Sequence, residues 1–124
     1  MDVLITGSKG FIGSNLKCFL ELNTSFNIIE HNRSDTEKIL KKKIIKSDII
    51  FHFGGKNRSK KKENFIKNNF KLSKIIAENA LQKSLIIYSS TLKVNENSIY
   101  GKTKKKAEVV LKEFCKKKKY KLSI

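Results

Sequence analysis

The feature that most constrains this chain is a set of three glycines, Gly7, Gly10 and Gly13, at three-residue intervals. An apolar run, residues 2–6, precedes them, and apolar residues at helical spacing follow from Phe11. Gly7 permits a tight turn off a strand, Gly10 lets a bound group approach the backbone, and Gly13 lets the helix pack closely against the sheet. This strand–loop–helix order predicts a dinucleotide site, with the pyrophosphate on the free N–H groups at the helix start. A merely structural turn is the alternative.

The rest of the chain repeats the alternation of strand and helix. Apolar runs predict further strands at 26–29, 48–53 and 84–89 and the start of a fifth at 120–124. Helical spacing predicts helices over 11–22, 63–81 and 100–117 and another through Ile39–Ile45, with Ser34 and Glu37 as a capping box. The pattern favours an α/β fold, a doubly wound parallel sheet that binds ligands at the carboxyl ends of its strands.

The net charge of +17 invites a nucleic-acid interpretation, which the residue types disfavour. Of the 28 basic residues 26 are Lys, and only Arg33 and Arg58 offer the bidentate fork that reads bases. The lysine runs are scattered, and the excess of Lys, Asn and Ile is typical of an A/T-rich coding sequence. We therefore expect solvated lysines and no specific nucleic-acid partner.

The remaining composition predicts a cytoplasmic protein. No apolar run approaches the roughly 20 residues needed to cross a bilayer, and the N-terminus does not resemble a signal peptide. Cys18 and Cys115 lie in unrelated segments without metal-ligand spacing, which favours free thiols and no metal site. His52, at the end of the third predicted strand, is interpreted as a structural residue.

The end of the second predicted strand bears on the choice of cofactor. An acidic residue there binds the adenosine ribose of NAD, whereas a basic one accepts the 2′-phosphate of NADP. Glu30 would serve the first purpose, and Asn32 with Arg33 at the tip would serve the second. We expect NADP(H), with NAD(H) as the alternative.

A tyrosine and a lysine four residues apart, Tyr100 and Lys104, share one face of a predicted helix start. A phenol is a weak acid at neutral pH, and a nearby ammonium favours its ionised form. Lys104 can also hydrogen-bond the nicotinamide ribose. The pair follows the fourth strand and Ser89-Ser90-Thr91, whose hydroxyls could bond the substrate oxygen that Tyr100 protonates. An ordinary amphipathic helix start is the alternative.

Four segments together resemble the extended short-chain dehydrogenase/reductase family, the NAD(P)-dependent epimerases, dehydratases and reductases of nucleotide sugars. They are TGSKGFIG at 6–13, DIIFHFGG at 48–55, IIYSST at 86–91 and YGKTK at 100–104. HFGGKNRS at 52–59 and the short segment between Thr91 and Tyr100 resemble the capsular-polysaccharide reductases in particular. Those enzymes reduce a 4-keto UDP-2-acetamido-2,6-dideoxy sugar.

The resemblance implies a Rossmann-type sheet and a role for each matching residue. The catalytic residues would be Thr91, which polarises the carbonyl, the acid Tyr100 and its partner Lys104. The cofactor would be held by the glycine loop, the second and third strand ends, and the fourth strand end with the catalytic helix: Gly7, Ser8, Lys9, Gly10, Phe11, Ile12, Gly13, Asn32, Arg33, Gly54, Gly55, Lys56, Ser89, Tyr100 and Lys104. NADPH would give hydride to C4 of the keto sugar.

The chain also departs from the family pattern. Gly54-Gly55 replaces a more usual Ala-containing pair, and Ile99 stands where close relatives have Pro. The resemblance further implies that 1–124 is an incomplete Rossmann domain, truncated after about the fifth strand, without the half that supplies the substrate pocket. A catalytically inactive NAD(P)-binding remnant, or an epimerase or dehydratase, is therefore the alternative to a reductase. Family members often form homodimers through two helices, an interface that Lys104–Lys106 and Lys116–Lys119 would weaken here.

Overall fold

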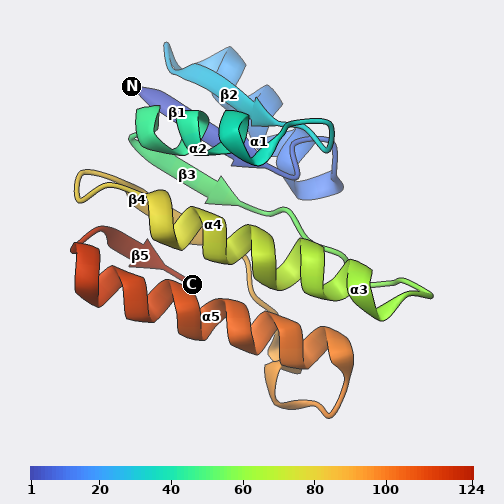
Figure 1. The fold of residues 1–124 in the computed structure, drawn as a ribbon. Coiled ribbons are helices and arrows are strands. Elements are labelled where there is room, and N and C mark those ends of the chain that lie inside the picture. The colour runs from blue at the N-terminus through green and yellow to red at the C-terminus, as the bar shows by residue number, and fades with distance from the viewer.

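The computed structural model describes all residues, 1–124, as one five-stranded parallel sheet with helices on both faces (Figure 1). The strands are β1 (Asp2–Thr6), β2 (Asn27–His31), β3 (Ile49–His52), β4 (Leu85–Tyr88) and β5 (Lys121–Ser123). Their order is β2-β1-β3-β4-β5, and every neighbouring pair is parallel. This architecture confirms the α/β doubly wound sheet expected from the sequence.

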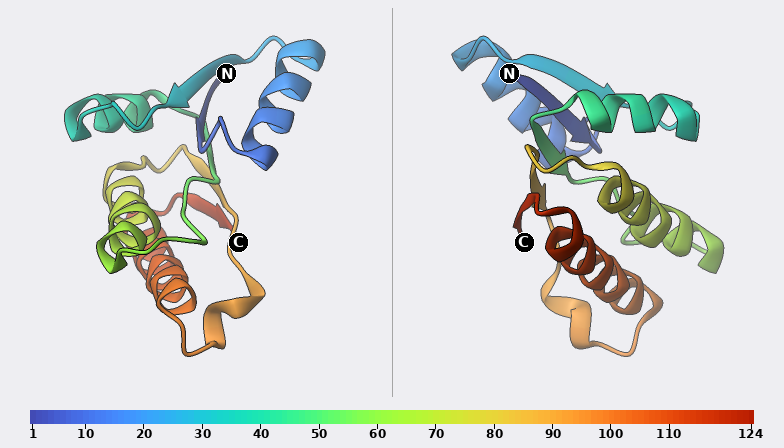
Figure 2. Two further views of the ribbon diagram at one scale, coloured as in Figure 1. Left: turned by 90° about the vertical axis from the view of Figure 1, so that its right-hand side faces the viewer. Right: turned by 60° about the vertical axis from the view of Figure 1, so that its left-hand side comes forward.

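The helices divide between the two faces of the sheet. Helix α1 (Phe11–Asn23) covers one face, and α2 (Glu37–Lys46), α4 (Leu72–Asn79) and α5 (Ile99–Lys118) cover the other (Figure 2). Side chains on β1 alternate between two cores, because successive residues of a strand point to opposite faces. Val3 and Ile5 pack with Leu20 of α1, whereas Leu4 packs with the larger cluster below α2, α4 and α5.

The order of the strands positions the site. The chain moves from β1 to β2 on one side, then returns past β1 to place β3 on its other side. The loops that leave the carboxyl ends of β1 and β3 therefore diverge, and a crevice opens between them. The glycine loop follows β1, so it lies at this switch point.

The long helix expected over 63–81 is interrupted. It consists of α3 (Lys62–Phe65), a π-helical turn η1 (Ile66–Lys71) and α4, and it ends at Asn79. The wider turn shifts the phase of the helix, so polar Asn69 and Ser73 are buried within it. Leu81, the last apolar residue of the helix predicted over 63–81, lies outside α4 and is exposed.

Two smaller expectations are also wrong. The N-cap of α2 is Thr36, whose Oγ1 accepts from the Ile39 amide, and not Ser34. The chain turns first, because the Asp35 amide donates to the Asn32 carbonyl. Phe19 of α1 is exposed although it continues the apolar stripe.

As for the membrane, none of the helices combines the length and the apolar character needed to cross one.

Candidate functional site

The turn after β1 requires glycine at its first position. Gly7 has φ +74°, a conformation that side chains of L-residues rarely adopt. A Cβ there would also lie 2.8 Å from the backbone nitrogen of Gly54, at the end of β3. The tight turn predicted for Gly7 is confirmed, and it brings the glycine loop against the neighbouring strand end.

Gly13 is required for a reason that differs in detail from the expectation. A Cβ at Gly13 would lie 2.2 Å from the carbonyl oxygen of Gly7. The first turn of α1 therefore packs against the glycine loop itself rather than directly on the sheet. At Gly10 a Cβ would meet only that same oxygen, at 3.2 Å, and the residue is otherwise exposed to the cleft.

The start of α1 presents unpaired hydrogen-bond donors. Its N-cap is Gly10, which has no side chain to cap the helix, and the first turn contains no acidic residue. The backbone N–H groups of Phe11, Ile12 and Gly13 have no acceptor within the chain. The hydroxyl of Ser8, in the glycine loop, is also buried without a hydrogen-bond partner. Unpaired donors at the positive end of a helix dipole fit the pyrophosphate of a dinucleotide.

A cleft of about 870 Å³ opens at the carboxyl ends of β1, β2 and β3. Of the residues expected at the cofactor, those lining it are Gly7, Ser8, Lys9, Gly10, Asn32, Arg33, Gly54 and Gly55. Three segments far apart in the sequence thus meet at one hollow. Phe11 and Ile12 are exposed at the start of α1, and Lys56 lines an adjoining hollow instead.

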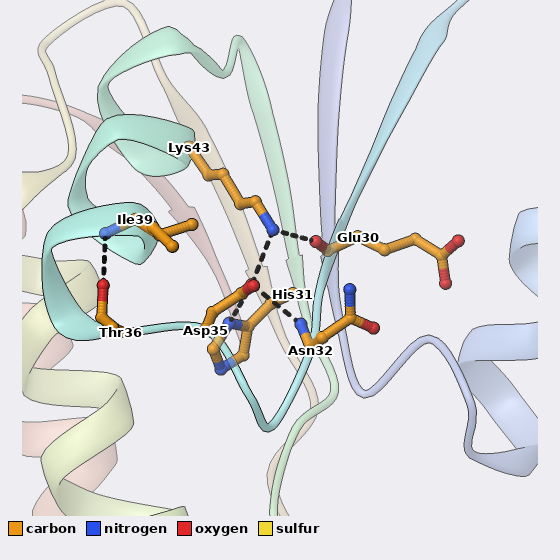
Figure 3. A network of polar contacts seen from close by, with 7 residues as sticks. All are labelled: Glu30, His31, Asn32, Asp35, Thr36, Ile39 and Lys43. Atoms are coloured by element: carbon orange, nitrogen blue, oxygen red, sulfur yellow. Dashed lines mark hydrogen bonds and ion pairs between the residues drawn. The ribbon is translucent and has the colours of Figure 1, made fainter.

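The loop after β2 is held by one carboxylate, as Figure 3 shows. Asp35 Oδ2 accepts from Lys43 Nζ at 2.6 Å, from the Asn32 amide at 2.9 Å, and lies 3.2 Å from His31 Nδ1. Burial would raise the pKa of Asp35, but these donors outweigh it and hold the pKa below its usual value. The network fixes the loop that carries Arg33.

Glu30 and Arg33, the two residues weighed for cofactor choice, have different surroundings. The Glu30 carboxylate is 2.5 Å from Lys17 Nζ of α1, which holds the pKa of Glu30 below its usual value. Glu30 does not line the cleft, whereas Arg33 is exposed and lines it. The carboxylate is thus already occupied, and the guanidinium is free to meet a ligand.

His52 is buried in a chain of polar contacts, in agreement with a structural role. Its Nε2 lies 2.7 Å from Ser73 Oγ, and its Nδ1 lies 2.8 Å from Thr6 Oγ1. Ser73 donates to the Asn69 carbonyl, and Thr6 Oγ1 accepts from the Gly54 amide. The proton inventory then requires neutral His52 to donate from Nε2 and accept at Nδ1. Burial lowers the pKa of His52 to about 3.

Lys104 reaches from α5 to the end of β4. Its Nζ donates to the Ser89 carbonyl at 2.6 Å and lies 4.2 Å from the centre of the Tyr88 ring. Burial lowers the pKa of Lys104 to about 8, and the carboxylate of Glu108 opposes this shift. Tyr100 lies half-buried one turn earlier on the same helix. The expected helix start thus lies beside the expected strand end.

Sequence reasoning missed Glu108, one turn after Lys104. It is 8% exposed, and its Oε1 accepts a hydrogen bond from Ser90 Oγ. Lys104 and Glu108 therefore hold two consecutive residues of the loop after β4. Thr91, the expected catalytic hydroxyl, caps the short helix η2 (Leu92–Asn95), where its Oγ1 accepts from the Lys93 amide at 3.2 Å. For Glu108, the available signal was an acid at i+4 from Lys104, just after the lysine run 104–106.

Asn69 was also missed. It is 1% exposed, its Oδ1 accepts from the Lys56 amide at 2.7 Å, and its Nδ2 donates to the Lys56 carbonyl at 2.9 Å. The same Nδ2 lies 3.2 Å from Thr103 Oγ1 of α5. This one side chain ties the loop after β3 to the helix that carries Tyr100. The signal was a pair of asparagines where the helical apolar period breaks.

Together, the fold and the glycine-loop cleft define a dinucleotide-binding protein of the doubly wound class. The sequence profile of the NAD dependent epimerase/dehydratase family matches residues 3–123. The chain therefore belongs to that family, which confirms the resemblance found in the sequence.

Individual relatives refine this assignment. The chain is 31% identical over 111 residues to the UDP-2-acetamido-2,6-beta-L-arabino-hexul-4-ose reductase of Pseudomonas aeruginosa, covering 87% of this chain and 30% of that protein. The capsular polysaccharide assembling protein CapF of Staphylococcus aureus superposes with a TM-score of 0.79 at 30% identity, over 100% of this chain and 34% of CapF. The chain thus spans about a third of these two relatives.

A more distant neighbour shares the fold alone. The UDP-glucuronic acid 4-epimerase of Bacillus cereus, determined in complex with NAD, superposes with a TM-score of 0.78 at 21% identity. The match covers 100% of this chain and 54% of the epimerase.

Proposed function

We propose that this chain is the cofactor-binding part of an NADPH-dependent reductase that acts at C4 of a 4-keto UDP-deoxyamino sugar in surface-polysaccharide synthesis. The observation that carries the proposal is the placement of two sites on one sheet. The glycine-loop cleft follows β1, and the Tyr100–Lys104 helix start lies beside the end of β4. The identity to a hexulose reductase supports the substrate class. Since the chain spans 30% of that relative, the activity of the whole enzyme is part of the proposal.

The choice of NADPH over NADH rests on the loop after β2. Arg33 lines the cleft and forms no ion pair, while Glu30 is paired with Lys17. A guanidinium offers several donors in a fixed geometry that suits a phosphate group. Arg33, with Asn32 beside it, would therefore hold the adenosine ribose and its 2′-phosphate.

The proposed chemistry divides between cofactor and chain. When bound, the cofactor supplies the hydride that reduces the ketone carbon. Tyr100 donates the proton to the resulting alkoxide oxygen, so that the ketone becomes an alcohol. Thr91 donates a hydrogen bond to the same oxygen and stabilises its developing charge. Lys104 keeps the strand end and the tyrosine helix in register through its bond to the Ser89 carbonyl.

Titration with NADPH, followed by an assay on a 4-keto UDP-2-acetamido-2,6-dideoxy sugar, tests this function. The proposal predicts binding of NADPH and its oxidation once the sugar is added. Binding without oxidation would identify the chain as a cofactor-binding remnant that is inactive alone. Absence of binding would contradict the cofactor site itself.

A homodimer through α4 and α5 remains part of the proposal. Together with η1, these two helices form a hollow of about 490 Å³ lined by the apolar residues Phe70 of η1 and Val109, Val110 and Phe114 of α5. Lys105 and Lys106 lie at its side, but Lys104 is buried and so does not add to the repulsion expected there. Sedimentation equilibrium at low and high salt would show whether screening these lysines promotes association.

A further inference from the structure

A second hollow adjoins the cofactor cleft. It has a volume of about 530 Å³ and lies between α2 and the α3–α4 segment. His31, Arg33, Asn68 and Leu72 line both hollows, so the two hollows adjoin at these residues. We call it the lysine groove, because its cations are Arg33 with Lys56, Lys67 and Lys71.

The cations of the lysine groove are unpaired, and its acids are not. Arg33 and the three lysines form none of the ion pairs in the chain. The groove also contains Asp35 and Glu37. Asp35 is paired with Lys43 at 2.6 Å, and Glu37 with Lys41 at 2.6 Å, and neither of these partners lines the groove. The net field in the hollow is therefore positive, and it suits an anion of more than one charge.

The lysines belong to a fixed part of the fold. Lys67 and Lys71 lie in the π-helical turn η1, four residues apart. Asn69, between them, is buried and holds the backbone of Lys56 by two hydrogen bonds. The turn that breaks the helical period thus sets three of the four cations around one hollow. A single turn of π-helix is often found at functional sites.

We propose that the lysine groove binds the phosphomonoester at the 2′ position of the adenosine ribose, and that Lys67 and Lys71 determine the preference for NADPH together with Arg33. This inference rests on the proposed cofactor function. The ribose of a dinucleotide on the glycine loop lies at the tip of the second strand, where Arg33 lines both hollows. A phosphate there carries close to two negative charges at pH 7, and the groove supplies unpaired ammonium groups to meet them.

Two isomeric nucleotides test the inference. Adenosine 2′,5′-bisphosphate and adenosine 3′,5′-bisphosphate have the same charge and composition, so a chain of net charge +17 attracts both equally from a distance. Isothermal titration calorimetry should show the 2′,5′ isomer binding at least about tenfold more tightly to the wild type. The double variant Lys67→Gln/Lys71→Gln should lose this preference while its affinity for 5′-AMP stays the same.

A matched control removes the same charge elsewhere. Lys38 and Lys42 are also four residues apart, are exposed on α2 and line neither hollow. Lys38→Gln/Lys42→Gln should keep the preference for the 2′,5′ isomer. Equal affinity of the two isomers for the wild type, or a preference that survives in Lys67→Gln/Lys71→Gln, would overturn the inference while 5′-AMP binding upholds the cofactor site. Failure of every adenosine nucleotide to bind would instead contradict the proposed function.

Discussion

The glycine loop and the loop after β4 both follow parallel strands, but they are built differently. Around Gly7 and Gly13 the arrangement is set by backbone, since any Cβ would collide with main-chain atoms. After β4 the arrangement is set by side chains, since Lys104 and Glu108 hold Ser89 and Ser90 from a helix that comes later in the chain. The first region depends on residues being small, and the second on two buried charged side chains that hydrogen-bond the loop.

The largest effect should come from breaking the backbone contact. Gly13→Ala places a Cβ 2.2 Å from the Gly7 carbonyl oxygen and should lower the free energy of unfolding by about 3 kcal/mol. Urea denaturation followed by circular dichroism measures this. Gly10→Ala is the control, because its single Cβ contact, at 3.2 Å from the same oxygen, should lower stability far less than the 2.2 Å contact at position 13. Equal stability of all three proteins would show that the loop tolerates side chains.

The next largest effect should come from lowering the pH, because the buried His52 of β3 contacts Thr6 at the end of β1 and Ser73 of α4. Unfolded His52 takes up a proton below pH 6.5, whereas folded His52 stays neutral down to about pH 3. The stability that neutral His52 gives the folded state is therefore fully present above pH 6.5, and it is lost as the pH falls. From pH 6.5 to 5 the loss should be about 2 kcal/mol.

Urea denaturation of the wild type and of His52→Gln across that pH range isolates the contribution of His52 to the free energy of unfolding. The variant should show a flatter dependence on pH, and the slope that remains belongs to groups such as His31, whose pKa burial also lowers. An identical slope in the two proteins would mean that His52 is not held neutral by burial.

The sequence predicts the backbone-determined glycine loop better than it predicts the loop after β4, which side chains hold in place. The turn at Gly7 and the close contact at Gly13 follow from local steric rules, and the alternation of apolar runs predicted the sheet. The burial of Asn69 depends on a π-helical turn that helical periodicity does not anticipate. The hydrogen bond from Ser90 to Glu108 forms because the loop after β4 packs against α5, and neither the sequence of the loop nor that of the helix predicts this contact.

For the loop after β4, a single substitution can change a charge and keep the hydrogen bond that holds the loop. Glu108→Gln keeps a hydrogen-bond acceptor for Ser90 but removes the charge that favours protonated Lys104. The pKa of Lys104 should then fall below its value of about 8. Carbon-13 NMR of the lysine side chains measures it, with the Lys104 signal assigned from Lys104→Met. Lys112→Gln, which removes an exposed partner of Glu108, should change that pKa much less. If the pKa of Lys104 is unchanged in Glu108→Gln, the Glu108 carboxylate does not favour the protonated form of Lys104.

The smallest effect should come from a position outside both regions. Lys119 ends α5 at φ +59°, a left-handed conformation that glycine adopts without strain. Lys119→Gly should therefore raise the free energy of unfolding by about 1 kcal/mol in the same denaturation experiment. Lys116→Gly, inside the helix, should lower it instead.

The most direct test of the central claim is calorimetric binding of NADPH to the wild type and to Gly10→Ala. The glycine loop accounts for binding by close approach of the pyrophosphate to the helix N-cap Gly10, which has no side chain, so the wild type should bind one NADPH per chain. Gly10→Ala, equally folded, should bind at least about tenfold more weakly. Equal binding by both proteins, or no binding by the wild type, would contradict the account.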